Sequence, residues 1–190
     1  MARVLIVHAS REGQTLRIAE RLADTLRETG HEVRLARSDP FPGIGGHDGV
    51  IVAASVHLGR HPRHLERAIR AHRTVLEHMP TAFLSVCLMA AGEDPLQRTE
   101  ADGYLQTFLQ RTGWRPDLAG TVAGAVRFSR YGFLKNRYMR AMTRGEGLGD
   151  GASDHEFTDW NDVRRFAEAF GALLESVPRP RFERRPRVAP

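Results

Sequence analysis

Hydrophobic residues in this chain form short runs that alternate with amphipathic stretches. The runs are apolar almost throughout, which predicts strands buried on both faces of a sheet. In the stretches between them, apolar residues recur at three- and four-residue spacing, which predicts helices. The predicted strands cover residues 3–9, 31–36, 49–55, 81–90 and 118–126, and the predicted helices cover residues 15–29, 62–78, 98–112 and 159–176.

This alternation predicts an α/β domain in which helices cover both faces of a parallel sheet. A doubly wound flavodoxin-like fold, with five strands in the order 2-1-3-4-5, agrees best with the pattern. We assign residues 1–176 to this domain. Residues 127–158 are too many for an ordinary connection, so we predict a long insert between the fifth strand and the closing helix.

Length and composition agree with one globular domain. The chain has 190 residues, of which 41% are hydrophobic, enough to bury a sizeable core. No apolar run approaches the ~18 residues that a membrane helix needs, and His8 and Arg11 interrupt the first run. We therefore expect neither a membrane helix nor a signal peptide, and a cytoplasmic location. Cys87 is the only cysteine, and we expect it to be buried and inert.

The positive charge of the chain is concentrated at its C-terminal end. The formal net charge is +5, but residues 177–190 contain five Arg and one Glu, so the rest of the chain carries only +1. This proline-rich tail is typical of a disordered basic extension. Because the domain itself is nearly neutral, we expect no nucleic-acid partner.

The segment SREGQT follows the first predicted strand and precedes the first predicted helix. Ser10, Gln14 and Thr15 offer side-chain donors, and Gly13 tolerates a left-handed backbone. The free N–H groups of the following helix would point to the same place, which favours an anion. Two interpretations stay open on these residues alone, a capped turn and a phosphate cradle.

Several nucleotide and phosphate sites are excluded by the residues present. The chain has neither the G-x-G-x-x-G pattern of dinucleotide sites nor a P-loop, and Lys135 is its only lysine. Glu93 stands six places after Cys87, where a cysteine phosphatase would need Arg. If a phosphate binds at SREGQT, it is therefore a monophosphate that is not hydrolysed.

His57, His61 and His64 lie close together in the sequence and resemble a ligand cluster. Pro62 separates them into two local structures, and the neighbouring Arg60 and Arg63 add positive charge that would oppose a cation. We expect no metal site here. No side chain is identifiable from the sequence as a catalytic base.

Several motifs resemble those of a known family, in the same order. SREGQT resembles the FMN phosphate loop of flavodoxins, and GVIVAASVHLG resembles their third strand and second flavin loop. With MPTAFLSVCLMA, WRPD, VAGAVRFSRY and TDW, the chain resembles the flavodoxin-type, menaquinone-dependent protoporphyrinogen oxidase family of bacteria over residues 3–172. Leu58 and His61 depart from the family, which has aromatic rings at these places.

The resemblance implies FMN as cofactor and assigns its contacts to four loops. The phosphate would bind at Ser10, Arg11, Glu12, Gly13, Gln14 and Thr15. The flavin ring would lie beside Ser55, Val56, His57, Leu58 and Gly59, beside Leu88, Met89, Ala90, Ala91 and Gly92, and beside Gly124 and Ala125 at the end of the fifth strand.

The insert is strongly basic at its start. Residues 127–144 hold six basic residues and no acidic one, and on a helix their Tyr and Met side chains would separate from their Arg side chains. Such a helix suits a membrane surface or an anionic ligand, or it packs its apolar face on the domain. By hypothesis, Arg127 and Arg130 bind the propionates of a porphyrinogen, because the guanidinium fork matches a carboxylate.

The resemblance implies oxidation of protoporphyrinogen IX in haem synthesis, with menaquinone or ubiquinone as electron acceptor. Contact with the inner face of the cell membrane and a homodimer are further expectations. Alternatives are a flavodoxin-like electron carrier, a quinone reductase that uses NAD(P)H, and a domain that has lost its flavin. A typical flavodoxin is acidic, whereas this domain is neutral to basic, which disfavours the carrier.

Overall fold

Five parallel strands form the central sheet, in the predicted order β2-β1-β3-β4-β5. We use a computed structural model that describes residues 1–10, 13–91, 95–126 and 155–177. Arg11, Glu12, Gly92, the insert from Arg127 to residue 154 and the tail from residue 178 lie outside the described residues. The strands are β1 (Arg3–Ala9), β2 (Glu32–Arg37), β3 (Gly49–Ser55), β4 (Thr81–Val86) and β5 (Leu118–Val122).

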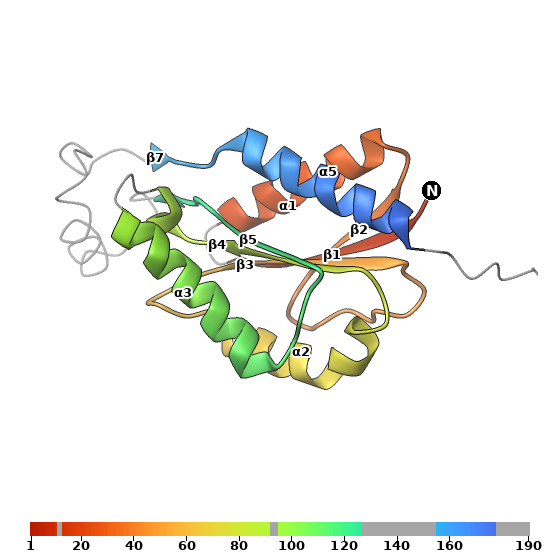
Figure 1. Cartoon of the computed structure of the whole chain (residues 1–190), viewed down its shortest axis with the longest axis horizontal. Coiled ribbons are helices and arrows are strands. Elements are labelled where there is room, and N and C mark those ends of the chain that lie inside the picture. The colour runs from red at the N-terminus through yellow and green to blue at the C-terminus, as the bar shows by residue number, and fades with distance from the viewer. Residues whose placement is uncertain (11–12, 92–94, 127–154, 178–190) are drawn as a thin grey trace, which may run out of the picture.

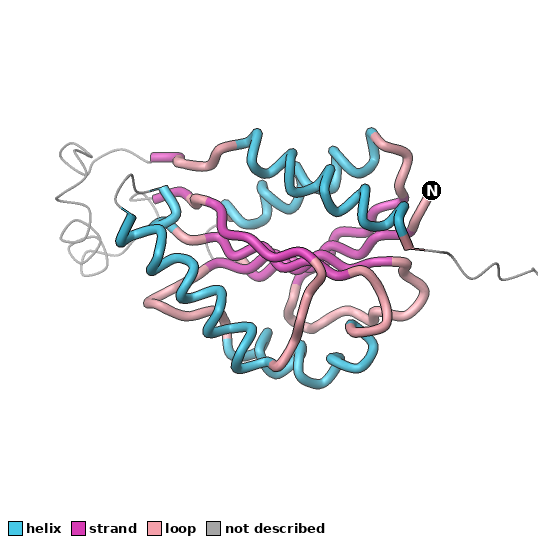
Figure 2. The backbone as a smooth tube through the Cα atoms, in the orientation of Figure 1, coloured by secondary structure: helices cyan, strands magenta, loops and turns pink. Residues whose placement is uncertain are grey.

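Helices cover both faces of the sheet (Figure 1). Helices α1 and α5 lie on one face and α2 and α3 on the other, while Figure 2 shows the strands as a single twisted layer between them. The bounds are α1 (Gln14–Glu28), α2 (Arg63–Leu76), α3 (Pro95–Thr112) and α5 (Trp160–Ser176). The predicted α/β architecture is therefore confirmed.

The alternation of side chains along each strand builds two hydrophobic cores. In β1, Val4 and Ile6 pack with residues of α1 and α5, whereas Leu5 and Val7 pack with residues of α2 and α3. All four side chains are fully buried, and burying an aliphatic side chain of this size contributes about 1.5–3 kcal/mol. This explains why the central strands are apolar at every position, since neither face meets water.

Three predicted elements differ from the structure by three residues or more at one end. The fourth strand ends at Val86, and Leu88–Ala91 form a short 3-10 helix, η1. The fifth strand ends at Val122, and α3 begins at Pro95. Hydrophobic residues continue past Val86 and Val122 because both segments stay partly covered after they leave the sheet, so the apolar run overestimates the strand.

A second, two-stranded sheet marks the base of the insert. Strand β6 (Ala125–Val126) pairs in antiparallel fashion with β7 (His155–Glu156), and the backbone N–H of Phe157 donates to the carbonyl of Gly124 at 3.1 Å. The chain thus leaves the domain and returns to it at the same place, beside the carboxyl end of β5 (Figure 1).

Candidate functional site

The carboxyl ends of four strands bring the predicted cofactor loops together. In the register of the sheet, Ala9 of β1 lies beside Ala54 of β3, Ser55 lies beside Val86 of β4, and Val86 lies beside Val122 of β5. The segments that follow these strands are therefore neighbours at one edge. In open α/β sheets this edge, where the strand order reverses, is where ligands bind.

The loop after β1 combines a stabilised turn with an open helix end. The hydroxyl oxygen of Ser10 accepts a hydrogen bond from the N–H of Gly13 at 2.9 Å, and Gly13 has a left-handed φ of 95°. Helix α1 follows without a side-chain cap, so its first N–H groups stay available to an anion. The two interpretations of SREGQT are compatible: Ser10 stabilises the turn and still has its own proton to donate.

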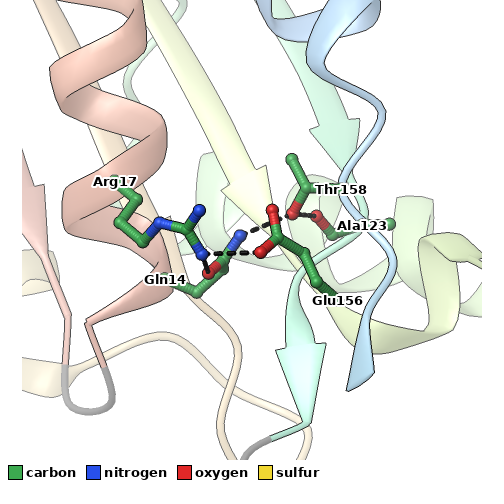
Figure 3. Close-up of polar contacts among 5 residues, drawn as sticks. All are labelled: Gln14, Arg17, Ala123, Glu156 and Thr158. Carbon is green, nitrogen blue, oxygen red and sulfur yellow. Dashed lines mark hydrogen bonds and ion pairs between the residues drawn. The ribbon is translucent and has the colours of Figure 1, made fainter. Parts of the chain in front are cut away.

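The side chain of Gln14 is buried and forms a long-range hydrogen bond that its place in the loop did not predict (Figure 3). Its side chain is only 5% exposed, and its amide nitrogen donates to the hydroxyl of Thr158 at 2.8 Å. Thr158 in turn donates to the carbonyl of Ala123 at 2.9 Å. The side chain of Gln14 thus connects the first loop to the base of the insert.

Arg17 extends this network at the protein surface (Figure 3). Its guanidinium donates to Glu156 of β7 at 2.6 Å and to the amide oxygen of Gln14 at 3.3 Å. It also lies over the ring of Trp160, 5.4 Å from the ring centre. Sequence separations of more than 130 residues hide this network from any local pattern.

The loop after β3 forms a tight turn with a strained residue at its tip. His57 and Arg60 pair through their backbones, and both residues between them have positive φ, 49° for Leu58 and 73° for Gly59. Such a turn normally carries Asn-Gly, because a bulky side chain disfavours positive φ. Leu58 is nevertheless 69% exposed. Strain that holds an apolar side chain out at a ligand edge points to a binding role.

The two remaining loops place small residues at the same edge. The N–H of Cys87 donates to the carbonyl of Val122 at 3.0 Å, which keeps η1 beside the end of β5. In η1, Leu88, Met89, Ala90 and Ala91 are all partly exposed. A Cβ on Gly124 would lie 3.3 Å from Val86 Cγ1, so this position favours glycine.

The three histidines do not form a cluster. His61 is 2% exposed, and its ring packs edge-on against Phe83 and Phe108 in the core. Its Nε2 lies 3.1 Å from the hydroxyl of Ser85, whereas His64 pairs with Ser38 at 2.9 Å. His61 therefore lies below the second loop instead of at its surface. Within the described residues, no group of three His, Cys, Asp or Glu side chains is arranged to hold a metal.

Burial sets the protonation of the polar core groups near this edge. Desolvation lowers the pKa of His61 to about 4, so its ring is neutral at pH 7. Burial also lowers the pKa of His8, and the nearby charge of Arg37 lowers it further. Cys87 is buried, as predicted, and burial raises the pKa of its thiol.

Two cavities open at this edge of the described structure. The larger, of about 750 Å³, lies between the ends of β1 and β2 and the start of α2, and we call it the basic pocket. Its charged lining consists of Arg37, Arg60, Arg63, Arg67 and Asp39. The smaller, of about 310 Å³, lies beside η1, β5 and the start of α5, and its charged lining consists of Arg98, Asp102, Asp159 and Asp162.

Comparisons with known proteins agree with this arrangement. A flavodoxin domain family matches residues 5–150. Protoporphyrinogen IX dehydrogenase (quinone) of Escherichia coli strain K12 is 33% identical over 178 residues, which cover 91% of this chain and 97% of that protein. This chain belongs to the flavodoxin-type protoporphyrinogen IX dehydrogenase family. The protein of that name from Leishmania major is 30% identical and covers 92% of this chain and 77% of its own length.

Membership of the flavodoxin-type protoporphyrinogen IX dehydrogenase family makes this chain an oxidoreductase of a flavin-binding class. Solved structures agree on the fold: oxidised flavodoxin 1 from Bacillus cereus superposes with a TM-score of 0.54 at 16% identity, covering 93% of this chain and 99% of its own. Among the described residues, no helix has the length and hydrophobicity required to span a bilayer.

Two motifs that this family shares with the chain have structural tasks here. In WRPD, the Trp114 ring is 1% exposed and packs on Phe83, and Asp117 accepts from the N–H of Thr81 at 2.8 Å. In TDW, Asp159 caps α5 by accepting from the N–H of Asn161 at 2.8 Å. These residues position the sheet edge and the insert.

The residues at this edge fit the flavin that the family implies. A monophosphate needs hydroxyl and backbone N–H donors, which Ser10 and the open end of α1 supply. A flat ring needs small or apolar neighbours, which the exposed Leu58 and the partly exposed Ala90 and Ala91 supply. From the sequence, Arg60 and Arg63 were interpreted only as charges that oppose a metal. That they share a pocket with Arg37 depends on the packing of the end of β2 beside the start of α2.

Proposed function

We propose that this protein is an FMN-dependent dehydrogenase that oxidises protoporphyrinogen IX to protoporphyrin IX and passes the electrons to menaquinone or ubiquinone. The main support is the meeting of four loops at the sheet edge where the strand order reverses, in a chain 33% identical to a protein named for this activity.

The cofactor would be held by the four loops. We propose that Ser10, Gly13 and the first turn of α1 bind the phosphate, together with Arg11, Glu12 and Thr15, and that residues 55–59, 88–92 and 124–125 surround the ring. When bound, FMN supplies an acceptor for two electrons and hydrogen from a carbon of the substrate. The chain's own task is to orient the substrate and to exclude water from that contact.

The insert carries the second part of the proposal. Arg127 and Arg130, which lie outside the described residues, would bind propionate groups of the substrate. Residues 127–144 would contact the inner face of the membrane, where the quinone resides, so the protein would be cytoplasmic and peripheral. The base of the insert, fixed by the Gln14–Thr158 contact, would keep it beside the flavin.

Two measurements on the purified full chain test this proposal. The absorption spectrum should show bound flavin, identified as FMN after release. Anaerobic oxidation of protoporphyrinogen IX, followed by porphyrin fluorescence, should depend on an added quinone such as menadione. A yellow protein that is inactive in this assay would contradict the proposed substrate and support an electron carrier instead. A colourless protein that cannot be reconstituted with FMN would contradict the proposal as a whole.

A further inference from the structure

The basic pocket lies next to the candidate flavin site but is built from other residues. Ser10, His57 and Leu58 line it on the side of the cofactor loops. On the far side it is lined by Arg37, at the end of β2, and by the first turns of α2. A ligand in this cavity of about 750 Å³ could therefore contact the tip of the second loop and the arginines together.

The charges of the basic pocket are not balanced by the chain. Four arginine side chains line it against a single carboxylate, that of Asp39. Among the described residues, none of Arg37, Arg60, Arg63 and Arg67 forms an ion pair. Unpaired arginines such as Arg34 also occur elsewhere on the surface, but here four of them line one cavity. Like charges gathered in a concave surface raise the local concentration of anions.

Two further groups of the basic pocket also lack a partner. Helix α2 begins after Pro62 with no side-chain cap, so its first N–H groups are open at the pocket wall. His8, also in the pocket lining, is only 8% exposed, and its Nδ1 has no hydrogen-bond partner in the described structure. The open end of α2 adds to the positive character that the four arginines give the basic pocket.

We propose that the basic pocket binds one of the two carboxylate groups of the substrate, the other being bound at the insert. The proposal rests on the proposed function, whose substrate is a largely apolar tetrapyrrole with two carboxylate arms. Arginine forks bind carboxylates through paired, charge-assisted hydrogen bonds. A substrate anchored at Arg37 and Arg63 would present its apolar body to Leu58 and to the flavin edge.

The test is a charge-removing double variant, Arg37→Gln with Arg63→Gln, in the full chain loaded with FMN. Both side chains are exposed and unpaired in the described structure, so folding should be unaffected. The KM for protoporphyrinogen IX should rise at least about tenfold, whereas kcat should change less, because the pocket binds the substrate away from the reacting atoms. Arg34→Gln, an exposed arginine on the same strand as Arg37, is the matched control and should leave KM unchanged.

A binding experiment tests whether the pocket recognises the carboxylates of the porphyrin or only binds its apolar ring. Fluorescence titration with protoporphyrin IX should show tighter binding to the wild type than titration with its dimethyl ester, which lacks both charges. In the double variant the difference in affinity between the diacid and the ester should become clearly smaller. The contrast should also weaken at high salt.

Three outcomes would overturn the assignment. One is an unchanged KM in the double variant while the wild type is active. Another is a rise in KM confined to an Arg127→Gln, Arg130→Gln variant, which would place both carboxylates at the insert. The third is loss of binding to phosphatidylglycerol vesicles with unchanged porphyrin binding, which would assign these arginines to a membrane. An inactive wild type would instead contradict the proposed function, and the porphyrin titration would still decide on the pocket.

Discussion

The two cavities at the carboxyl edge of the sheet differ in how their charged groups are used. In the smaller cavity every carboxylate has a partner within the chain: Asp102 accepts from Thr121, Asp159 caps α5, and Asp162 pairs with Arg165. In the basic pocket, none of the four arginines forms an ion pair with another described residue. Both cavities adjoin the predicted flavin contacts, so their position does not distinguish them.

This difference separates structural polar groups from candidate ligand groups. The partners of the smaller cavity and the Gln14–Thr158–Ala123 network beside it are internal, and they hold the base of the insert against α1. An arginine without an ion pair adds no electrostatic stabilisation to the fold. Four such arginines in one concave surface repel each other. An external anion would therefore bind most favourably in the basic pocket.

The largest effect is expected from breaking the internal network. Thr158→Val removes the hydroxyl and leaves the amide of Gln14 and the carbonyl of Ala123 without their shared partner. Because each unsatisfied buried group costs about 1–3 kcal/mol, the free energy of unfolding should fall by about 2–4 kcal/mol. Urea denaturation of the FMN-free protein measures this change. Thr158→Ser keeps the hydroxyl and should lose much less; equal losses in both variants would show that the hydrogen bonds do not matter.

The next effect concerns pH and the floor of the basic pocket. His61 has a pKa of about 4 when folded against an ordinary value of 6.5, so the unfolded chain takes up a proton that the folded chain does not. The free energy of unfolding should therefore decrease as pH falls from about 6.5 to about 4, with a loss of about 2 kcal/mol from this group by pH 5.

His61→Phe isolates this contribution, since His8 titrates in the same direction in both proteins. The difference in unfolding free energy between pH 7.5 and pH 5, from urea denaturation at both values, should be smaller in the variant by about 2 kcal/mol. If the unfolding free energy of the wild type and of the variant decreases equally between pH 7.5 and pH 5, His61 is not the group that causes the decrease.

A smaller effect is expected at the tip of the second loop. Leu58→Asn places a residue that tolerates positive φ in the turn and should raise the stability of the FMN-free protein by about 1 kcal/mol. The same change should weaken FMN binding, because it removes an exposed apolar side chain from the ring site. Denaturation and FMN titration together test whether strain and binding are linked.

Gly59→Ala is the contrasting variant in this turn. It should destabilise the protein, because φ at Gly59 is 73°, a conformation that a residue with a Cβ adopts only with strain. If the Leu58→Asn protein is more stable and still binds FMN as tightly as the wild type, the strain at Leu58 does not serve FMN binding.

The smallest effects are expected from two single arginine variants, one at Arg17 in the internal network and one at Arg63 in the basic pocket. Arg17→Gln removes an ion pair with Glu156 and the contact with Trp160, and should cost about 0.5–1 kcal/mol. Arg63→Gln removes an unpaired charge and should leave stability unchanged or raise it by a few tenths of a kcal/mol. Thermal or urea denaturation at low salt gives the comparison. A destabilised Arg63→Gln would mean that this arginine supports the fold, contrary to our interpretation.

Much of the fold could be predicted from sequence because it depends on local periodicity. The apolar runs identified all five strands of the sheet and the order of the elements, and the capping residue Asp159 marked the start of the closing helix within a residue. Strand ends were less predictable. After Val86 and Val122 the side chains stay partly buried although the backbone has left the sheet, and hydrophobicity reports burial rather than hydrogen bonding.

In the candidate site, too, local features could be predicted from the sequence and long-range contacts could not. Ser10 and Gly13 were found because the loop chemistry is local, whereas Gln14 was predicted as a loop donor without its buried partner. The role of His61 could not be seen, since only packing against Phe83 and Phe108 places it in the core. The assignments of Arg127 and Arg130 stay predictions.

By itself, the sequence determined the α/β class, the alternation of strands and helices, the phosphate-loop candidate and the family resemblance, because each depends on residues that are adjacent or regularly spaced. The strand order followed from the fold type that this alternation indicates. Only the tertiary structure decided which polar groups are paired and which are left open. Arg37 and Arg63 come from different elements and share a pocket only because the parallel sheet brings the end of β2 beside the start of α2. Whether a charge has a partner depends on distance in space, and a linear pattern does not contain that distance.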